Sequence, residues 1–220
     1  MNWTIPNLLS VIRVLAAPCV ALAFVVFERP EADQIAVLIF AGAAATDYLD
    51  GFLARSLDQE SAFGRMLDPV ADKAMVIIAL AIIIALYDME WPIMIPAVLI
   101  ILREVLISGL REFLGDVKLA VTRVAKWKTT VQMIAIGLLL VRGALTPDPA
   151  AEPIRSALGK VLEPMGIGAG ALGLALLWVA AWFTIVTGVD YFRKGLPHIR
   201  EKDGQAPTAV AATVAAETKD

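Results

Sequence analysis

The sequence predicts an all-α integral membrane protein whose six transmembrane helices enclose a polar cavity at their cytoplasmic end. Three observations lead to this fold class: the composition is strongly apolar, six stretches are long enough to span a bilayer, and the ionisable residues of those stretches gather at one end. Of the 220 residues, 59% are hydrophobic and 19% are charged, and the mean hydropathy is +0.73. A soluble globular enzyme of this length needs less apolar surface, so the composition disfavours that class.

Charge and cysteine content narrow the classes further. The formal net charge is -3, which leaves no basic excess for binding nucleic acid. The single cysteine, Cys19, excludes an internal disulfide framework. Membrane lipids are therefore the expected surroundings, and nucleic acid is not an expected partner.

Six apolar stretches, each of about 20 residues, are expected to form the spanning helices. They cover residues 8–27, 35–53, 67–87, 91–110, 125–141 and 171–191. No Lys or Arg precedes Asn7 and Pro18 interrupts the first stretch, so we expect a retained helix there and not a cleaved signal peptide. Together the six form one membrane domain over residues 1–202.

Lysine and arginine predict the orientation, because cytoplasmic loops carry their excess. The segments that follow the second, fourth and sixth spans hold Arg55, Arg65, Arg111, Lys118, Arg123, Arg193, Lys194, Arg200 and Lys202. The opposite side has only Arg29, Arg142, Arg155 and Lys160. Both termini should therefore be cytoplasmic.

Two segments lie outside the spans. Residues 146–164 are rich in proline but carry Ile154, Leu158 and Leu162 at helical spacing, so a short helix on the outer membrane surface and an ordinary loop are equally compatible with them. Residues 203–220 are mostly small residues with scattered charges and are expected to form a disordered cytoplasmic tail.

Four aspartates stand at the cytoplasmic ends of two successive spans. Asp47 and Asp50 are at positions i and i+3, and Asp68 and Asp72 at i and i+4, so each pair shares one helix face. Four neighbouring carboxylates repel one another unless a cation neutralises them. Oxygen-only ligation without nearby Cys or His favours Mg²⁺, with Mn²⁺ or Ca²⁺ as alternatives, and two divalent ions would balance the four charges.

Small residues accompany these aspartates. Gly51 and Ala54 follow Asp50, and Gly64 precedes Asp68 by one helical turn. Each small residue alone is typical of helix packing in membranes. Together with the carboxylates they indicate a nucleotide that lies against bare backbone.

Residues 47–72 fit the pattern D-x2-D-G-x2-A-R-x8-G-x3-D-x3-D without a departure. This is the signature of the CDP-alcohol phosphotransferase family, which the chain resembles. The segments 5–13 (IPNLLSVIR), 63–73 (FGRMLDPVADK), 103–112 (REVLISGLRE) and 126–133 (KWKTTVQM) look most like the bacterial members that make phosphatidylglycerophosphate. The likeness covers roughly residues 4–142.

This resemblance implies a metal-dependent transferase of the bacterial cytoplasmic (inner) membrane that works as a homodimer. It would transfer the phosphatidyl group of CDP-diacylglycerol to sn-glycerol 3-phosphate and release CMP, in the synthesis of phosphatidylglycerol and cardiolipin. Asp47, Asp50 and Asp68 resemble the ligands of two Mg²⁺ or Mn²⁺ ions. Asp72 resembles the general base and is counted as a further metal ligand.

The resemblance also implies two sets of substrate contacts. CDP-diacylglycerol would meet Gly51, Ala54, Arg55 and Gly64, with Asn7 and Arg13 reaching the same cavity or serving only the helix end. The phosphate of the acceptor requires a cationic pocket, for which the candidates are Arg103, Arg111, Lys126 and Lys128, with Arg123 as an outside candidate. Arg103 is foremost because it follows a long uncharged run, and Glu104 is expected to pair with a neighbouring cation.

Other functions share these features. The same aspartates would serve an enzyme whose acceptor is inositol phosphate, serine or phosphatidylglycerol. From another class, a cation-coupled transporter also buries aspartates, although it should carry polar groups at several depths, and here the outer halves of the spans are almost free of charge.

Overall fold

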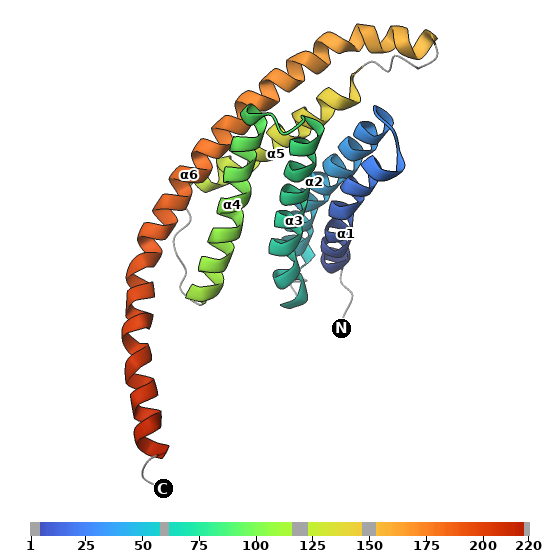
Figure 1. The fold of residues 1–220 in the computed structure, drawn as a ribbon. Coiled ribbons are helices and arrows are strands. Elements are labelled where there is room, and N and C mark those ends of the chain that lie inside the picture. Colours follow the sequence, from blue (N-terminus) through green and yellow to red (C-terminus); the bar gives the residue numbers. More distant parts are fainter. Residues whose placement is uncertain (1–4, 58–61, 116–122, 147–152, 218–220) are drawn as a thin grey trace.

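The computed structural model of the chain is a bundle of α-helices (Figure 1). It describes the backbone of residues 5–57, 62–115, 123–146 and 153–217, and the side chains of residues 7–46, 64, 66–115, 127–146 and 159–199. The described residues form α1 (Ile5–Val26), α2 (Glu31–Leu57), α3 (Ala62–Leu86), α4 (Trp91–Leu114), α5 (Arg123–Ala144) and α6 (Pro153–Glu217). The predicted all-α class is confirmed.

Short connections at one end of the bundle keep consecutive helices antiparallel. Between α3 and α4 the chain reverses within a few residues, because Asp88 and Met89 adopt left-handed backbone angles with φ of 52° and 56°. Pro92 then occupies the first turn of α4, where a missing backbone N–H costs nothing. At the other end Gly115, with φ of 61°, terminates α4.

The helices pack through small and branched apolar residues. Helix α1 lies against α2 and α3, α5 lies between α2 and α6, and α4 packs on α6. Ala17, Ala36 and Ala79 are completely buried beside Leu80 and Leu140 in one continuous core. Small side chains let the helix backbones approach closely, which is how helices associate in a bilayer.

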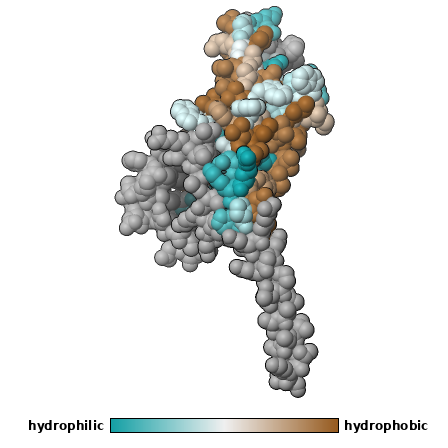
Figure 2. Space-filling view, turned by 90° about the vertical axis from the view of Figure 1, so that its left-hand side faces the viewer, coloured by the Kyte–Doolittle hydropathy of each residue, from teal (hydrophilic) through white to brown (hydrophobic). Residues whose placement is uncertain are grey.

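Four helices contain stretches that are long and apolar enough to cross a membrane: Asn7–Val26, Met66–Leu86, Trp91–Leu114 and Gly159–Ile199. A multi-pass membrane protein is therefore indicated, and the predicted spans in α1, α3, α4 and α6 are confirmed by length and composition. The spans predicted within α2 and α5 are not among them and stay predictions. Figure 2 shows a broad apolar surface above a hydrophilic patch on the face that it draws.

Helix α6 is longer than the predicted sixth span. Its backbone is helical from Pro153 to Glu217, so it includes both the end of the segment 146–164 and most of the segment expected to form a tail. In Figure 1 it arches over one end of the bundle and extends past the other helices at the opposite end. Alanine has the strongest helix propensity, and residues 209–216 contain five alanines, which accounts for the helical backbone there.

Candidate active site

A cavity of about 560 Å³ opens at the end of the bundle where α3 and α5 begin and α4 ends. The three helices supply side chains of both charges to it. Besides Pro69 and Val76, its walls consist of Asp68, Asp72, Lys73, Arg103, Glu104, Arg111, Lys128, Thr129 and Gln132. Two of the predicted metal ligands and three of the predicted acceptor-binding residues therefore lie around one cavity.

Helix α1 holds the two aspartates of α3. The Ser10 hydroxyl donates a hydrogen bond of 2.5 Å to Oδ1 of Asp68. One Arg13 guanidinium nitrogen lies 2.7 Å from Oδ1 of Asp72. The Arg13 side chain is only 3% exposed, whereas that of Asp72 is 55% exposed, so the carboxylate remains accessible while its buried partner fixes its orientation.

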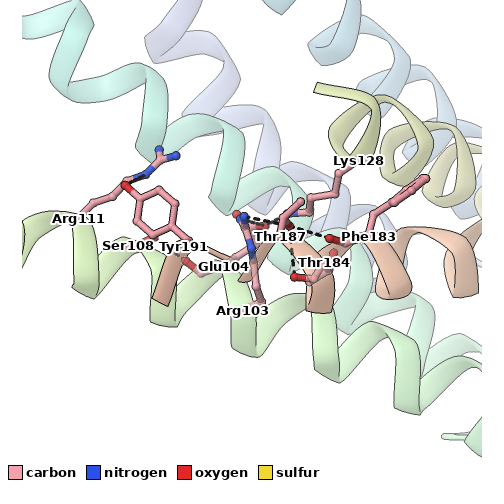
Figure 3. Close-up of polar contacts among 9 residues, drawn as sticks. All are labelled: Arg103, Glu104, Ser108, Arg111, Lys128, Phe183, Thr184, Thr187 and Tyr191. Carbon is pink, nitrogen blue, oxygen red and sulfur yellow. Dashed lines mark hydrogen bonds and ion pairs between the residues drawn. The ribbon is translucent and has the colours of Figure 1, made fainter. Parts of the chain in front are cut away.

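The predicted basic residues Arg103 and Lys128 meet at Glu104 (Figure 3). Arg103 donates to Oε1 of Glu104 at 3.1 Å, and the Lys128 ammonium contacts the same oxygen. All three side chains are largely buried, with exposures of 17% for Arg103, 14% for Glu104 and 5% for Lys128. Buried charges must be paired to be tolerated, so the expected pairing of Glu104 with neighbouring cations is confirmed.

Two side chains of α6, Thr187 and Tyr191, contact the two arginines of α4. Arg103 donates to the Thr187 hydroxyl at 3.4 Å, and Thr187 in turn donates to the Phe183 carbonyl at 2.7 Å. One turn further along α6, the Tyr191 hydroxyl accepts from Nε of Arg111 at 3.2 Å, and the guanidinium carbon of Arg111 lies 5.3 Å from the centre of the tyrosine ring. Figure 3 shows these contacts around both arginines.

A glycine permits this close contact between α4 and α6. A Cβ atom at Gly188 would lie 3.3 Å from Cγ of Arg103. Any larger residue would therefore press against the stem of the arginine. Glycine at position 188 of α6 therefore leaves room for the Arg103 side chain.

Two polar atoms near the cavity are buried without a hydrogen-bond partner among the described residues: Nε of Arg103 and Oε1 of Gln132. Leaving such groups unpaired costs free energy unless a ligand completes their hydrogen bonds. One is a donor and the other an acceptor, and both belong to residues that line the cavity.

Sequence reasoning missed several residues of this site. Ser10, Gln132, Thr187 and Tyr191 were not singled out, and Lys73 appeared only as the last residue of the segment 63–73. Gln132 carries the clearest signal, because it is an amide directly before the apolar run 133–141, and it is buried with 2% exposure. The other three are ordinary polar residues whose importance depends on which neighbouring helix they contact.

The remaining predicted residues are placed only in part. Asn7 is buried on α1 and is not among the described residues of the cavity wall, while Gly64 is buried one turn before Asp68. Five predicted residues belong to the last turns of α2 and one to the first turn of α5, and their side chains lie outside the described residues: Asp47, Asp50, Gly51, Ala54, Arg55 and Lys126. The outside candidate Arg123 likewise begins α5 beyond the described side chains.

Of the predicted four-carboxylate metal site, the structure therefore describes only the side chains on α3, Asp68 and Asp72. Among the described side chains no three acidic, histidine or cysteine residues come together. Asp68 and Asp72 lie one turn apart and line the same cavity, and oxygen donors of this kind suit a hard divalent cation. The donor chemistry of α3 fits the expected Mg²⁺ or Mn²⁺.

Comparison with known proteins extends over the whole bundle. Residues 3–189 match the CDP-alcohol phosphatidyltransferase family. A relative from Cereibacter sphaeroides is 47% identical over 220 aligned residues, which cover 92% of this chain and 100% of the relative. A relative from Rickettsia bellii is 36% identical over 195 residues, with 88% of this chain and 96% of the relative covered.

A third relative, from Haemophilus influenzae, is 44% identical over 146 residues, which cover 64% of this chain and 78% of the relative. All three carry the name CDP-diacylglycerol--glycerol-3-phosphate 3-phosphatidyltransferase. The family match includes every helix that contributes a side chain to the cavity, and not only the aspartate motif.

Proposed function

Because the chain belongs to the CDP-alcohol phosphatidyltransferase family, we propose that it transfers the phosphatidyl group of CDP-diacylglycerol to sn-glycerol 3-phosphate. The products are phosphatidylglycerophosphate, a precursor of phosphatidylglycerol and cardiolipin, and CMP. The observation that carries this proposal is the cavity in which Asp68 and Asp72 face Arg103, Arg111 and Lys128. Carboxylates for a metal-bound diphosphate and cations for a second phosphate are what this pair of substrates requires.

Metal binding is assigned to the aspartates. Asp47, Asp50 and Asp68, with Asp72 as a further ligand, would hold two Mg²⁺ or Mn²⁺ ions. Such ions, when bound, neutralise charge on the diphosphate of the donor and on the departing CMP. The Ser10 hydroxyl supports this assignment, since its hydrogen bond orients the Asp68 carboxylate.

Asp72 is assigned the role of general base, which accepts the proton of the attacking hydroxyl group. The acceptor oxygen forms a bond to the lipid-side phosphorus, the bond between that phosphorus and the CMP oxygen breaks, and the hydroxyl proton passes to the carboxylate. Arg13 holds one oxygen of Asp72 at 2.7 Å, and the side chain is still 55% exposed. The carboxylate is thus both oriented and reachable.

The acceptor phosphate is assigned to Arg103, Arg111 and Lys128, with Lys126 as the fourth predicted member. Arg103 lines the cavity, and its Nε is buried without a partner among the described residues. Glu104 holds Arg103 and Lys128 at a common oxygen, so the two cations approach the phosphate from a fixed geometry. Arginine and lysine contacts to phosphate are among the stronger hydrogen bonds available.

The binding of CDP-diacylglycerol is assigned to residues that accompany the aspartates in the sequence motif and on α1. Gly51, Ala54, Arg55 and Gly64 would line its nucleotide and diphosphate, with Asn7 and Arg13 on α1 beside them. The acyl chains would stay in the bilayer. The same proposal includes six spans with cytoplasmic termini and a cytoplasmic active site, which the charge pattern supports. It also includes the bacterial inner membrane and a homodimer, which the family resemblance supports.

Swapping the acceptor tests the proposal. Protein purified in detergent receives CDP-diacylglycerol and Mg²⁺ together with glycerol 3-phosphate, inositol phosphate, serine or phosphatidylglycerol, and CMP and lipid products are measured. We expect CMP release and phosphatidylglycerophosphate with glycerol 3-phosphate only, and loss of both after chelation. Serine and phosphatidylglycerol make less use of a pocket with three cations. Inositol phosphate would use it equally, and the expectation against it rests on the resemblance of the flanking segments.

Each outcome of the swap has a definite meaning. Turnover with inositol phosphate alone would retain the family and refute the glycerol phosphate acceptor. Release of CMP that persists after chelation would refute the metal assignment. Because the reaction in detergent needs no transmembrane gradient, turnover there also separates an enzyme from the cation-coupled transporter considered above.

A further inference from the structure

A second cavity, of about 340 Å³, lies at the opposite end of the bundle from the candidate active site. It is formed where α1, α3 and α5 end and α4 begins. Its charged side chains are Arg29, Arg142, Asp88 and Glu90, and Tyr87 lies among them. None of these residues has a part in the reaction proposed above.

Arg29 is held in this cavity by a carboxylate from within the bundle. Its Nε lies 2.7 Å from Oδ2 of Asp33 and one terminal nitrogen lies 3.1 Å from Oδ1. Asp33 is fully buried, whereas the Arg29 side chain is 46% exposed. Gly143 makes room for the pair, since a Cβ there would lie 1.9 Å from Oδ1 of Asp33. Two nitrogens of Arg29 are thus engaged by Asp33, and the residue lines the cavity.

Arg142 is positioned without a carboxylate. Its guanidinium carbon lies 5.1 Å from the centre of the Tyr87 ring, and the Tyr87 hydroxyl donates to the Leu139 carbonyl at 3.0 Å. Gly170 lets the arginine stem pass, because a Cβ there would lie 2.3 Å from Cδ of Arg142. Among the described residues Arg142 forms no ion pair. It is an exposed, oriented guanidinium group, which is the preferred partner of a phosphate.

Tryptophans indicate where this cavity lies relative to the bilayer. Trp91, at the start of α4, is 65% exposed, and Nε1 of Trp178 donates to the Pro92 carbonyl at 2.9 Å. Tryptophan gathers at the level of the lipid headgroups. Ile93 and Leu174 add an apolar wall to the cavity. A ligand with a polar head and an apolar body fits this position better than a small soluble ion does.

We propose that this cavity binds the headgroup of a zwitterionic phospholipid that carries a primary ammonium group. The phosphodiester lies on Arg142 and Arg29, and the ammonium lies on the carboxylates of Asp88 and Glu90. The wall offers both arginines and carboxylates, and Asp33 behind it already offsets part of the charge of Arg29, so a ligand that carries a phosphate and an ammonium group is complementary to it. A choline headgroup cannot donate hydrogen bonds to the carboxylates, and an anionic glycerol headgroup meets them with no opposite charge.

Lipid retention by the whole protein tests the proposal. The chain is purified in detergent, freed of lipid, and titrated with phosphatidylethanolamine, phosphatidylcholine or phosphatidylglycerol while native mass spectrometry counts bound lipid. We expect wild type to prefer phosphatidylethanolamine. Arg142→Gln should weaken that binding by about tenfold, the loss expected for a hydrogen bond to a charged group. Lys160→Gln removes an equal charge from an exposed position of α6 outside this cavity wall and should bind as wild type does.

A second pair of variants tests the other half of the headgroup without touching the packed arginine. Asp88→Asn and Glu90→Gln alter exposed residues, and asparagine tolerates the left-handed angles of position 88. Both should lower phosphatidylethanolamine binding and raise phosphatidylglycerol binding. These variants decide the question if Arg142→Gln fails to fold, which its melting temperature in lipid-free detergent reveals.

Three results would overturn the proposal. The first is equal retention of the three lipids by wild type, and the second is unchanged selectivity in Asp88→Asn and Glu90→Gln. The third is displacement of the bound lipid by soluble phosphoethanolamine at matched concentration, which would assign the cavity to a water-soluble phosphate ester.

Discussion

The two ends of the helix bundle both carry buried charge, but their hydrogen bonds are completed to different degrees. At the end with Asp68 and Asp72, Nε of Arg103 and Oε1 of Gln132 are buried without a partner among the described residues. At the other end, both oxygens of Asp33 accept from Arg29. Polar groups that the chain itself satisfies contribute to stability, whereas buried groups that it leaves incomplete lower stability and indicate a functional role for their residues.

This difference separates catalysis from stability. Substitutions around the first cavity should change turnover or substrate affinity more than they change the melting temperature. Substitution of Asp33 should do the reverse, because this carboxylate is buried against Arg29 and neither residue lines the first cavity. The following predictions are ordered by their expected effect on catalysis.

The largest effect is expected for Asp72→Asn. The amide keeps the shape of the side chain but cannot accept the hydroxyl proton, so kcat should fall by about 10²- to 10⁴-fold. The rate of CMP release under saturating substrates measures this loss. Wild-type turnover in Asp72→Asn would refute the role of Asp72 as general base. Its ion pair with Arg13 would then have only a structural role.

A smaller effect is expected for Arg103→Gln, which removes a cation assigned to the acceptor phosphate. The KM for glycerol 3-phosphate should rise by about 10- to 100-fold, the equivalent of one or two charged hydrogen bonds, and kcat should change much less. Initial rates across a range of acceptor concentrations separate the two constants. Arg193→Gln, on an exposed residue of α6, is the matched control and should keep the wild-type KM. A drop in kcat at unchanged KM would move Arg103 from acceptor binding to the chemical step.

Helix α6 should influence the site through Thr187, by a few-fold only. Thr187→Val removes the hydroxyl that Arg103 contacts at 3.4 Å, a long hydrogen bond between neutral and charged groups. We expect the KM for glycerol 3-phosphate to rise by about two- to tenfold. Thr187→Ser keeps the hydroxyl and should retain wild-type affinity, whereas equal KM values in both variants would show that this hydrogen bond does not affect acceptor binding.

The sequence predicted those parts of the site that rest on charge in an apolar surrounding. Arg103 stands out because it follows a long uncharged run, and the spacing of Asp68 and Asp72 requires a shared helix face. The structure brings all three to one cavity. Charge in hydrocarbon is so costly that its presence in a span is informative without any knowledge of the neighbours.

The partners of these charges could not be predicted in the same way. Ser10 and Thr187 are neutral and short, and such residues are common in membrane helices for reasons of packing. Their roles depend on which helix lies opposite, which is a property of the bundle and not of the local sequence. The same limit applied to Asp33: near a helix start it resembles an ordinary first-turn acid, and only the approach of α5 at Gly143 buries it completely.

At the opposite end, Asp33→Asn should leave catalysis unchanged and lower stability. The substitution replaces one of the two acceptor oxygens by an NH2 group and removes the charge that pairs with Arg29 in a fully buried position, which costs about 1–3 kcal/mol. Thermal unfolding in detergent should report a lower melting temperature, while kcat and both KM values stay at wild-type levels. The unchanged kinetics follow from the separation of this pair from every residue of the first cavity wall.

A matched aspartate on α6 sharpens that last expectation. Asp190 pairs with Lys194 at 2.6 Å across one helical turn, but the two side chains are 45% and 39% exposed. Exposed pairs of this kind contribute only about 0.3–0.5 kcal/mol, so Asp190→Asn should barely change the melting temperature. Equal melting temperatures in the two variants would mean that burial adds nothing to the Arg29–Asp33 pair. If Asp33→Asn instead reduced turnover without affecting stability, the two ends of the bundle would be coupled, and the division between a catalytic end and a structural end would fail.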